Sequence, residues 1–156
     1  MHRLGIVVFM VVVVGAAAVG TQGSPLAQFR GQYRVNQGPV GTVRVADALG
    51  ASYTEWTVSV GQPSHELRML VGPRRADNTF PVWRFEQEPA PNVVQEGTGR
   101  LSGQEFVADF PSRDGEPGKF IRERWTLRDG RLQFDLEASG EGVGPRRVGG
   151  FIAVRE

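Results

Sequence analysis

An alternation of apolar and polar residues, repeated from about residue 29 to the end of the chain, constrains the fold more than any other feature. Side chains along a strand point in turn to opposite faces, so a period of two predicts strands with one buried face. Gly, Pro, Asn or Asp interrupts the alternation about every eight to twelve residues, which is typical of antiparallel barrels and sandwiches. The predicted strands cover residues 29–36, 40–46, 53–60, 65–71, 79–87, 93–101, 104–110, 118–128, 131–139 and 146–155. We therefore predict an all-β fold, an antiparallel up-and-down β-barrel of about eight to ten strands.

The first twenty residues have the layout of a secretory signal. Arg3 supplies a positive charge, a valine-rich apolar run follows from Leu4 to Val19, and small residues lead up to Gly20. This pattern predicts an N-terminal signal helix over residues 1–20, a barrel domain over residues 21–156, and a secreted or periplasmic protein. The alternative is an uncleaved anchor, because about sixteen apolar residues fall just short of the roughly twenty that span a membrane.

Charge and cysteine content exclude several classes of protein. Of the 18 basic residues Arg3 belongs to the signal, so 17 remain against 17 acidic residues and the barrel is formally neutral. A neutral domain is not expected to bind nucleic acid. The chain contains no cysteine, which excludes disulfides and a lipid-modified N-terminal Cys. The domain must therefore depend on its hydrophobic core, for which about 136 residues are enough.

The hairpin around Asp129-Gly130 has the strongest local signal, because both central positions of a type I′ turn require positive φ. Its register turns Glu123 inward, opposite Leu136. The other inward pairs are Leu127 with Leu132, Trp125 with Phe134, and Ile121 with Ala138. The outer face then pairs opposite charges, Arg124 with Asp135 and Arg122 with Glu137.

Two other hairpins follow from turn signals. A four-residue loop at 61–64 pairs Trp56 with Met69, Val58 with Leu67, and Val60 with His65. A turn at Ser102-Gly103 pairs Phe106 with Gly99, Ala108 with Gly97, Arg100 with Glu105, and Glu96 with Asp109. A large ring opposite a glycine is compatible with a curved, closely packed sheet. The expected inward aromatic and sulfur-containing side chains are Trp56, Met69, Trp83, Phe85, Phe106, Phe110, Trp125 and Phe134.

The stretches "FRGQYRV", "EGTGRLSG" and "FIAVRE" resemble the lipocalin-like (calycin) barrels, in particular a bacterial lipocalin-like family of unknown function. The resemblance covers nearly all of the chain after the signal. Lipocalins carry Gly-x-Trp on the first strand and an Arg near the last strand that packs across the ring. The matching positions here are Gly31, Tyr33 and Arg155, with Tyr in place of Trp. The resemblance implies a closed end and an open mouth.

The up-and-down order supports this arrangement. The first strand starts and the last strand ends at the same end of the barrel, so Tyr33 and Arg155 are expected to form a cation–π contact there. The opposite end collects the loops 37–39, 61–64, 88–92, 111–117 and 140–145. These loops are longer on average and are predicted to surround the mouth.

Glu123 is the first candidate site residue. An inward carboxylate in an apolar barrel must be paired, hydrogen-bonded, hydrated or protonated. One interpretation is a polar anchor for a ligand, or a general acid or base. The other is a rim residue in water, or a partner for an inward Arg. Both interpretations are compatible with the sequence.

His65 is the only histidine after the signal and falls at the same end as Glu123. The pair would form an acid–base couple, but no Ser or Cys nucleophile accompanies it. The alternative is a solvated residue at the edge of a loop. One His with scattered carboxylates is a poor ligand set, so neither a metal nor another cofactor is expected.

The aromatic residues Trp56, Trp83, Trp125, Phe106 and Phe134 either line a pocket or fill the core. The first functional hypothesis is a barrel that binds a small, mostly apolar ligand, with Glu123 and His65 as polar contacts. The second is an enzyme that uses Glu123 on a hydrophobic substrate, and no catalytic set is assigned. The third is a filled barrel with a structural or interaction role in the cell envelope. The sequence does not determine the oligomeric state, and membrane contact is expected only through an uncleaved signal.

Overall fold

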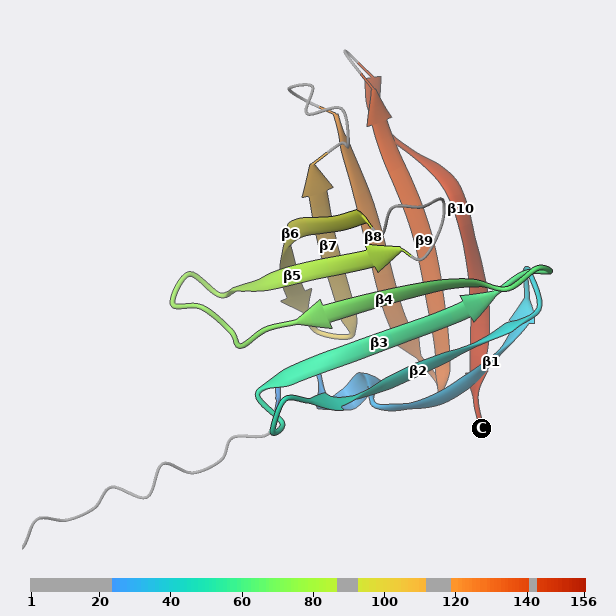
Figure 1. Cartoon of the computed structure of the whole chain (residues 1–156), viewed down its shortest axis with the longest axis horizontal. Coiled ribbons are helices and arrows are strands. Elements are labelled where there is room, and N and C mark those ends of the chain that lie inside the picture. Colours follow the sequence, from blue (N-terminus) through green and yellow to red (C-terminus); the bar gives the residue numbers. More distant parts are fainter. Residues whose placement is uncertain (1–23, 87–92, 112–118, 141–142) are drawn as a thin grey trace, which may run out of the picture.

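The computed structural model describes residues 24–86, 93–111, 119–140 and 143–156. The predicted signal segment and most of the predicted loops 88–92 and 111–117 lie outside these ranges. In the described part the strands form one closed antiparallel barrel, in which each strand pairs with the next and β1 pairs with β10 (Figure 1). The ten predicted strands are all found, as β1 Gly31–Gln37, β2 Gly41–Ala48, β3 Tyr53–Val60, β4 His65–Val71, β5 Thr79–Glu86, β6 Val93–Ser102, β7 Glu105–Pro111, β8 Phe120–Arg128, β9 Arg131–Gly140 and β10 Val143–Arg155.

Two of the three predicted hairpin registers are confirmed. In the β8–β9 hairpin Trp125 pairs with Phe134 and Glu123 with Leu136, as predicted from the turn. Asp129 and Gly130 take φ values of 50° and 72°, which is the positive pair that a type I′ turn needs. The β3–β4 hairpin has all three of its predicted pairs, which are Trp56 with Met69, Val58 with Leu67, and Val60 with His65.

The predicted register of β6 and β7 is wrong by two residues. The turn lies at Gly103-Gln104, so that Ser102 pairs with Glu105 and Gly99 with Ala108. A shift of two residues keeps every side chain on its predicted face. Phe106 still covers Gly99, because a Cβ at Gly99 would lie 2.5 Å from its ring. The predicted pair of Glu96 with Asp109, which would place two negative charges opposite each other, is absent, since Thr98 lies opposite Asp109.

The predicted orientation of Trp83 and Phe85 is also wrong. The buried residues of β5 are Phe80, Val82 and Arg84, so Trp83 and Phe85 lie on the outer face. The Trp83 indole Nε1 donates to Glu96 Oε1 at 3.3 Å, outside the barrel. The segment "FPVWRF" carries apolar side chains on both faces, and the outer ones are only partly covered.

Aromatic side chains fill the part of the barrel interior next to the short 3₁₀ segment and the Tyr33–Arg155 contact described below, which we call the lower half. Trp56 lies at the centre, with ring centroids 5.2 Å from Phe29, 6.0 Å from Phe106 and 4.8 Å from Trp125. All four residues are fully buried. Phe29 belongs to the short 3₁₀ segment η1, Ala27–Phe29. Within the described ranges, no helix has the length and apolar character needed to cross a membrane.

Tyr33 and Arg155 close one end of the barrel, as predicted. The Arg155 guanidinium lies 5.4 Å from the Tyr33 ring centroid, and its Nη2 donates to the Tyr33 hydroxyl at 2.9 Å. Nη2 also donates to the backbone oxygens of Gln28 and Arg30. The Tyr33 hydroxyl donates to the Phe29 carbonyl at 2.7 Å. These bonds tie η1 across the closed end.

Candidate functional site

A cavity of about 780 Å³ occupies the other end of the barrel. Its upper border includes the exposed residues Pro39, Ser64 and His65, which belong to the ends and loops of β1–β2 and β3–β4. Its walls are mostly apolar, with side chains from Val58, Val60, Leu67, Phe134, Leu136 and Phe151. The predicted mouth therefore leads into a hollow half of the barrel, the upper half, while the half next to the closed end is filled by the aromatic core.

Arg84 forms the polar floor of this cavity. Its side chain is 7% exposed, and it enters from β5 because Phe80 and Val82 set the inward alternation of that strand. Nε donates to Glu123 Oε1 at 2.7 Å, and Nη1 donates to Gln95 Oε1 at 2.7 Å. Nη2 forms an ion pair with Glu86, which also lines the cavity. A buried guanidinium is thus held by two carboxylates and one amide.

Glu123 points inward as predicted, and it is fully buried. Burial raises the pKa of Glu123 above the ordinary range of a glutamate, while the charge and hydrogen bond of Arg84 act in the opposite direction. Its second oxygen, Oε2, and the indole nitrogen of Trp125 are buried and form no hydrogen bond of standard geometry among the described residues, but the nearby Trp125 N–H also lowers the pKa of Glu123. Glu123 is a partner of an inward Arg, which was one of the two interpretations of the sequence.

The structure does not bring the predicted site residues together. Phe134 lines the cavity and His65 stands exposed at its border. Glu123 does not line the cavity, since Arg84 lies on the cavity side of the ion pair. No contact joins His65 to Glu123 in the described part of the chain. The remaining predicted residues divide between the filled core, with Trp56, Trp125 and Phe106, and the outer face, with Trp83.

Sequence reasoning missed Arg84, Glu86 and Gln95. The signal was present for Arg84: alternation counted from Phe80 and Val82 places it inside, whereas alternation counted from Trp83 and Phe85 places it outside. The two large rings of Trp83 and Phe85 favoured the second count over the first. Gln95 is buried directly after the exposed Val94, near the start of β6, and no apolar pattern in the sequence identifies it.

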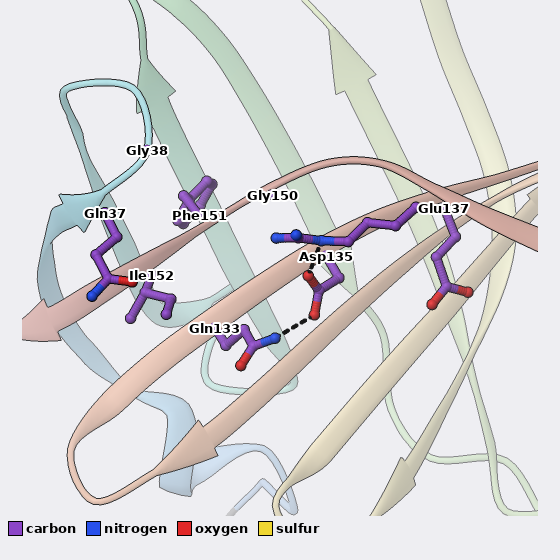
Figure 2. Close-up of a pocket in the computed structure, with 9 residues that line it drawn as sticks. Gln37, Gly38, Gln133, Asp135, Glu137, Gly150, Phe151 and Ile152 are labelled. Atoms are coloured by element: carbon purple, nitrogen blue, oxygen red, sulfur yellow. Dashed lines mark hydrogen bonds and ion pairs between the residues drawn. The ribbon is translucent and has the colours of Figure 1, made fainter.

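A second cavity of about 590 Å³ lies on the outer side of β9 and β10 (Figure 2). Gln133 donates to Asp135 at 2.6 Å, and Arg147 Nε lies 2.6 Å from the other oxygen of Asp135. Figure 2 shows Gln133 and Asp135 side by side along β9. The central carboxylate is therefore already satisfied within the protein, so this cavity is a weaker candidate than the interior one.

The described residues contain no group of three or more His, Asp or Glu side chains arranged to hold a metal ion. Fold and cavity together define a class: a closed ten-stranded antiparallel β-barrel with an interior cavity at one end. No protein-family model matches the chain, and no similar curated protein was found.

Proposed function

We propose that this protein is an exported, lipocalin-like barrel that binds a small, mostly apolar ligand in its interior. The interior cavity is the observation that carries the proposal. Its volume of about 780 Å³ falls within the range of about 300–1,000 Å³ that small-molecule sites occupy. Mostly apolar walls with a few convergent polar groups are the usual composition of such sites.

The closed end supports the lipocalin-like assignment. The contact between Tyr33 and Arg155 joins the first and last strands where the resemblance expects an aromatic ring and an Arg. The three stretches of sequence that resemble the family also support the family name, and the signal-like residues 1–20 support export.

The two alternative functions have less support. A filled barrel with a structural role would have no cavity of this size above its aromatic core. An enzyme that uses Glu123 as an acid or base needs the carboxyl to reach its substrate. Glu123 is fully buried, and Arg84 occupies the position between it and the cavity. Ligand binding therefore agrees best with the geometry.

Native mass spectrometry of the protein purified from its own host tests the proposal directly. We expect an added mass from a small molecule that is released intact by organic solvent. A ligand that leaves unchanged favours carriage over catalysis. The uncharged dye Nile red provides a second test, because its fluorescence rises when it enters an apolar cavity.

A filling substitution makes the dye experiment specific. Leu67→Trp places a large ring in the cavity and is expected to reduce dye affinity at least about tenfold. Leu70→Trp is the matched control, because Leu70 lies on the outer face of the same strand, opposite Trp83. Absence of both a co-purified molecule and Leu67-dependent dye binding would disprove the proposal.

A further inference from the structure

The charged residues at the cavity floor, Arg84 and its two carboxylate partners, restrict the charge of the ligand that the cavity accepts. We infer that the interior site selects an uncharged ligand with a hydrogen-bond acceptor, such as an ester, ketone or amide carbonyl, and discriminates against anionic amphiphiles. This inference rests on the proposed function, since it assigns the ligand class of the same cavity. It follows from the contacts of Arg84.

Arg84 retains hydrogen-bonding capacity toward the cavity. A guanidinium has five N–H groups. One on each of Nε, Nη1 and Nη2 is used by Glu123, Gln95 and Glu86. Nη1 and Nη2 each carry a second N–H, and because Arg84 lines the cavity these are the donors that its floor offers to a ligand. A buried donor without an acceptor is costly, so a ligand oxygen at this position gains a bond that the apolar walls do not offer.

The positive charge of Arg84 is already matched. Glu123 and Glu86 both contact the guanidinium, and Glu86 is itself part of the cavity lining. A ligand carboxylate that bound Arg84 would bring a further negative charge within a few ångströms of Glu86. Like charges repel strongly at such distances in a partly dry site. A neutral carbonyl accepts the same N–H groups without this repulsion.

The side chains of the cavity walls above Arg84 determine the polarity expected for the rest of the ligand. Phe134, Leu136 and Phe151 come from β9 and β10, and Val58, Val60 and Leu67 face them from β3 and β4. These side chains favour an apolar body above the polar floor. The ligand class is therefore an apolar molecule with one neutral acceptor group at its buried end.

The test compares two ligands of equal chain length, dodecanoate and methyl dodecanoate, by displacement of Nile red at about pH 7.5. Esters are more apolar than carboxylates, so the wild-type ratio of affinities alone is not decisive. The decisive quantity is the change in this ratio in Glu86→Gln. Gln keeps an acceptor for Arg84 and removes one negative charge, so the preference for the ester should fall at least about tenfold.

Glu105→Gln is the matched control. Glu105 is an acidic residue on the outer face of β7, where it pairs with Arg124. Its replacement should leave the ratio within about twofold of wild type. A ratio that is the same in wild type and Glu86→Gln would overturn the charge discrimination, while Nile red binding would still support the proposed function. If neither the dye nor the ligands bind, the proposed function fails and the inference fails with it.

A second measurement uses the unmodified protein and does not depend on the folding of a variant. Methyl dodecanoate with an isotope-labelled carbonyl is bound to wild type, and its infrared stretching band is recorded. A hydrogen bond from Arg84 should move the band to lower frequency than in an alkane solvent. A band at the alkane position would show that the carbonyl does not contact a donor and would overturn the assignment of the acceptor.

Discussion

The side chains of Arg84 and Glu123 join two strands that are not neighbours in the sheet. Arg84 lies on β5 and Glu123 on β8, with β6 and β7 between them, and Nε lies 2.7 Å from Oε1. Gln95 of β6 extends this bridge, because it accepts from Arg84 and donates to the carbonyl of Pro111 in β7 at 3.3 Å. One polar bridge therefore contacts four consecutive strands, at the level where the filled core gives way to the cavity.

Removal of the arginine alone should destabilise the barrel strongly. Arg84→Met leaves the carboxyl of Glu123 fully buried without its cation, and loss of one partner of a buried pair costs about 3–5 kcal/mol. Urea unfolding at neutral pH measures this loss. The double variant Arg84→Met/Glu123→Gln should recover part of it, because no buried charge remains. Additive effects of the two substitutions would contradict the coupling.

The stability of the protein should carry a pH dependence from Glu123. Burial raises the pKa of Glu123 in the folded chain, so the folded state holds this proton more tightly than the unfolded state. The resulting stabilisation is complete below the unfolded pKa of about 4.3 and is lost as pH rises toward the folded pKa. Relative to Glu123→Gln, the unfolding free energy of wild type should therefore fall as pH rises above about 4.3. If the unfolding free energy of wild type minus that of Glu123→Gln stays constant or increases between pH 4 and pH 9, the pKa of Glu123 is not raised by folding.

Tyr33→Phe should loosen the closed end. The substitution removes a hydroxyl that donates to Phe29 and accepts from Arg155, in a residue that is fully buried. Loss of such bonds costs about 1–3 kcal/mol. Hydrogen exchange should accelerate at residues 27–30 and remain unchanged in the β8–β9 hairpin. Uniform acceleration over the whole barrel would indicate that the closed end does not open separately.

Gly99→Ala should destabilise the β6–β7 region. A Cβ at Gly99 would lie 2.5 Å from Phe106 Cζ and 3.0 Å from Val82, inside a packed core. Overpacking of this kind costs about 1–3 kcal/mol. Gly140→Ala is the matched control, because a Cβ at Gly140 meets nothing within 4 Å. Thermal unfolding of the two variants should separate them by several degrees, and equal midpoints would contradict the packing argument.

The strand register could be predicted from the sequence only where the turn residues allow a single turn position. Asp129-Gly130 allows one turn only, because both residues tolerate positive φ and neither neighbour does so as readily. Around Gly103 the glycine takes a φ of 57° but is the first residue of the turn, with Gln104 as the second. A pairing shifted by two residues preserves both faces, so hydrophobic alternation cannot distinguish the two registers.

The candidate site was less predictable than the fold. The inward direction of Glu123 followed from its hairpin and is confirmed. Its partner Arg84 lies 39 residues earlier, on a strand whose apolar residues occupy both faces. Contacts across the barrel interior depend on how the sheet closes, and local alternation carries no information about which strands face each other. The same limit applies to Gln95.

Both ends of the described chain lie at the closed end of the barrel. Ser24 Oγ lies 3.2 Å from the hydroxyl of Thr54, and the backbone N–H of Glu156 donates to Gln32 at 2.9 Å. The cavity is at the opposite end, beside His65 and Pro39. An affinity tag, a sensor surface or an immobilising linker joined directly before Ser24 or after Glu156 would therefore attach at the closed end, opposite the opening of the cavity, and leave that opening accessible to solutes.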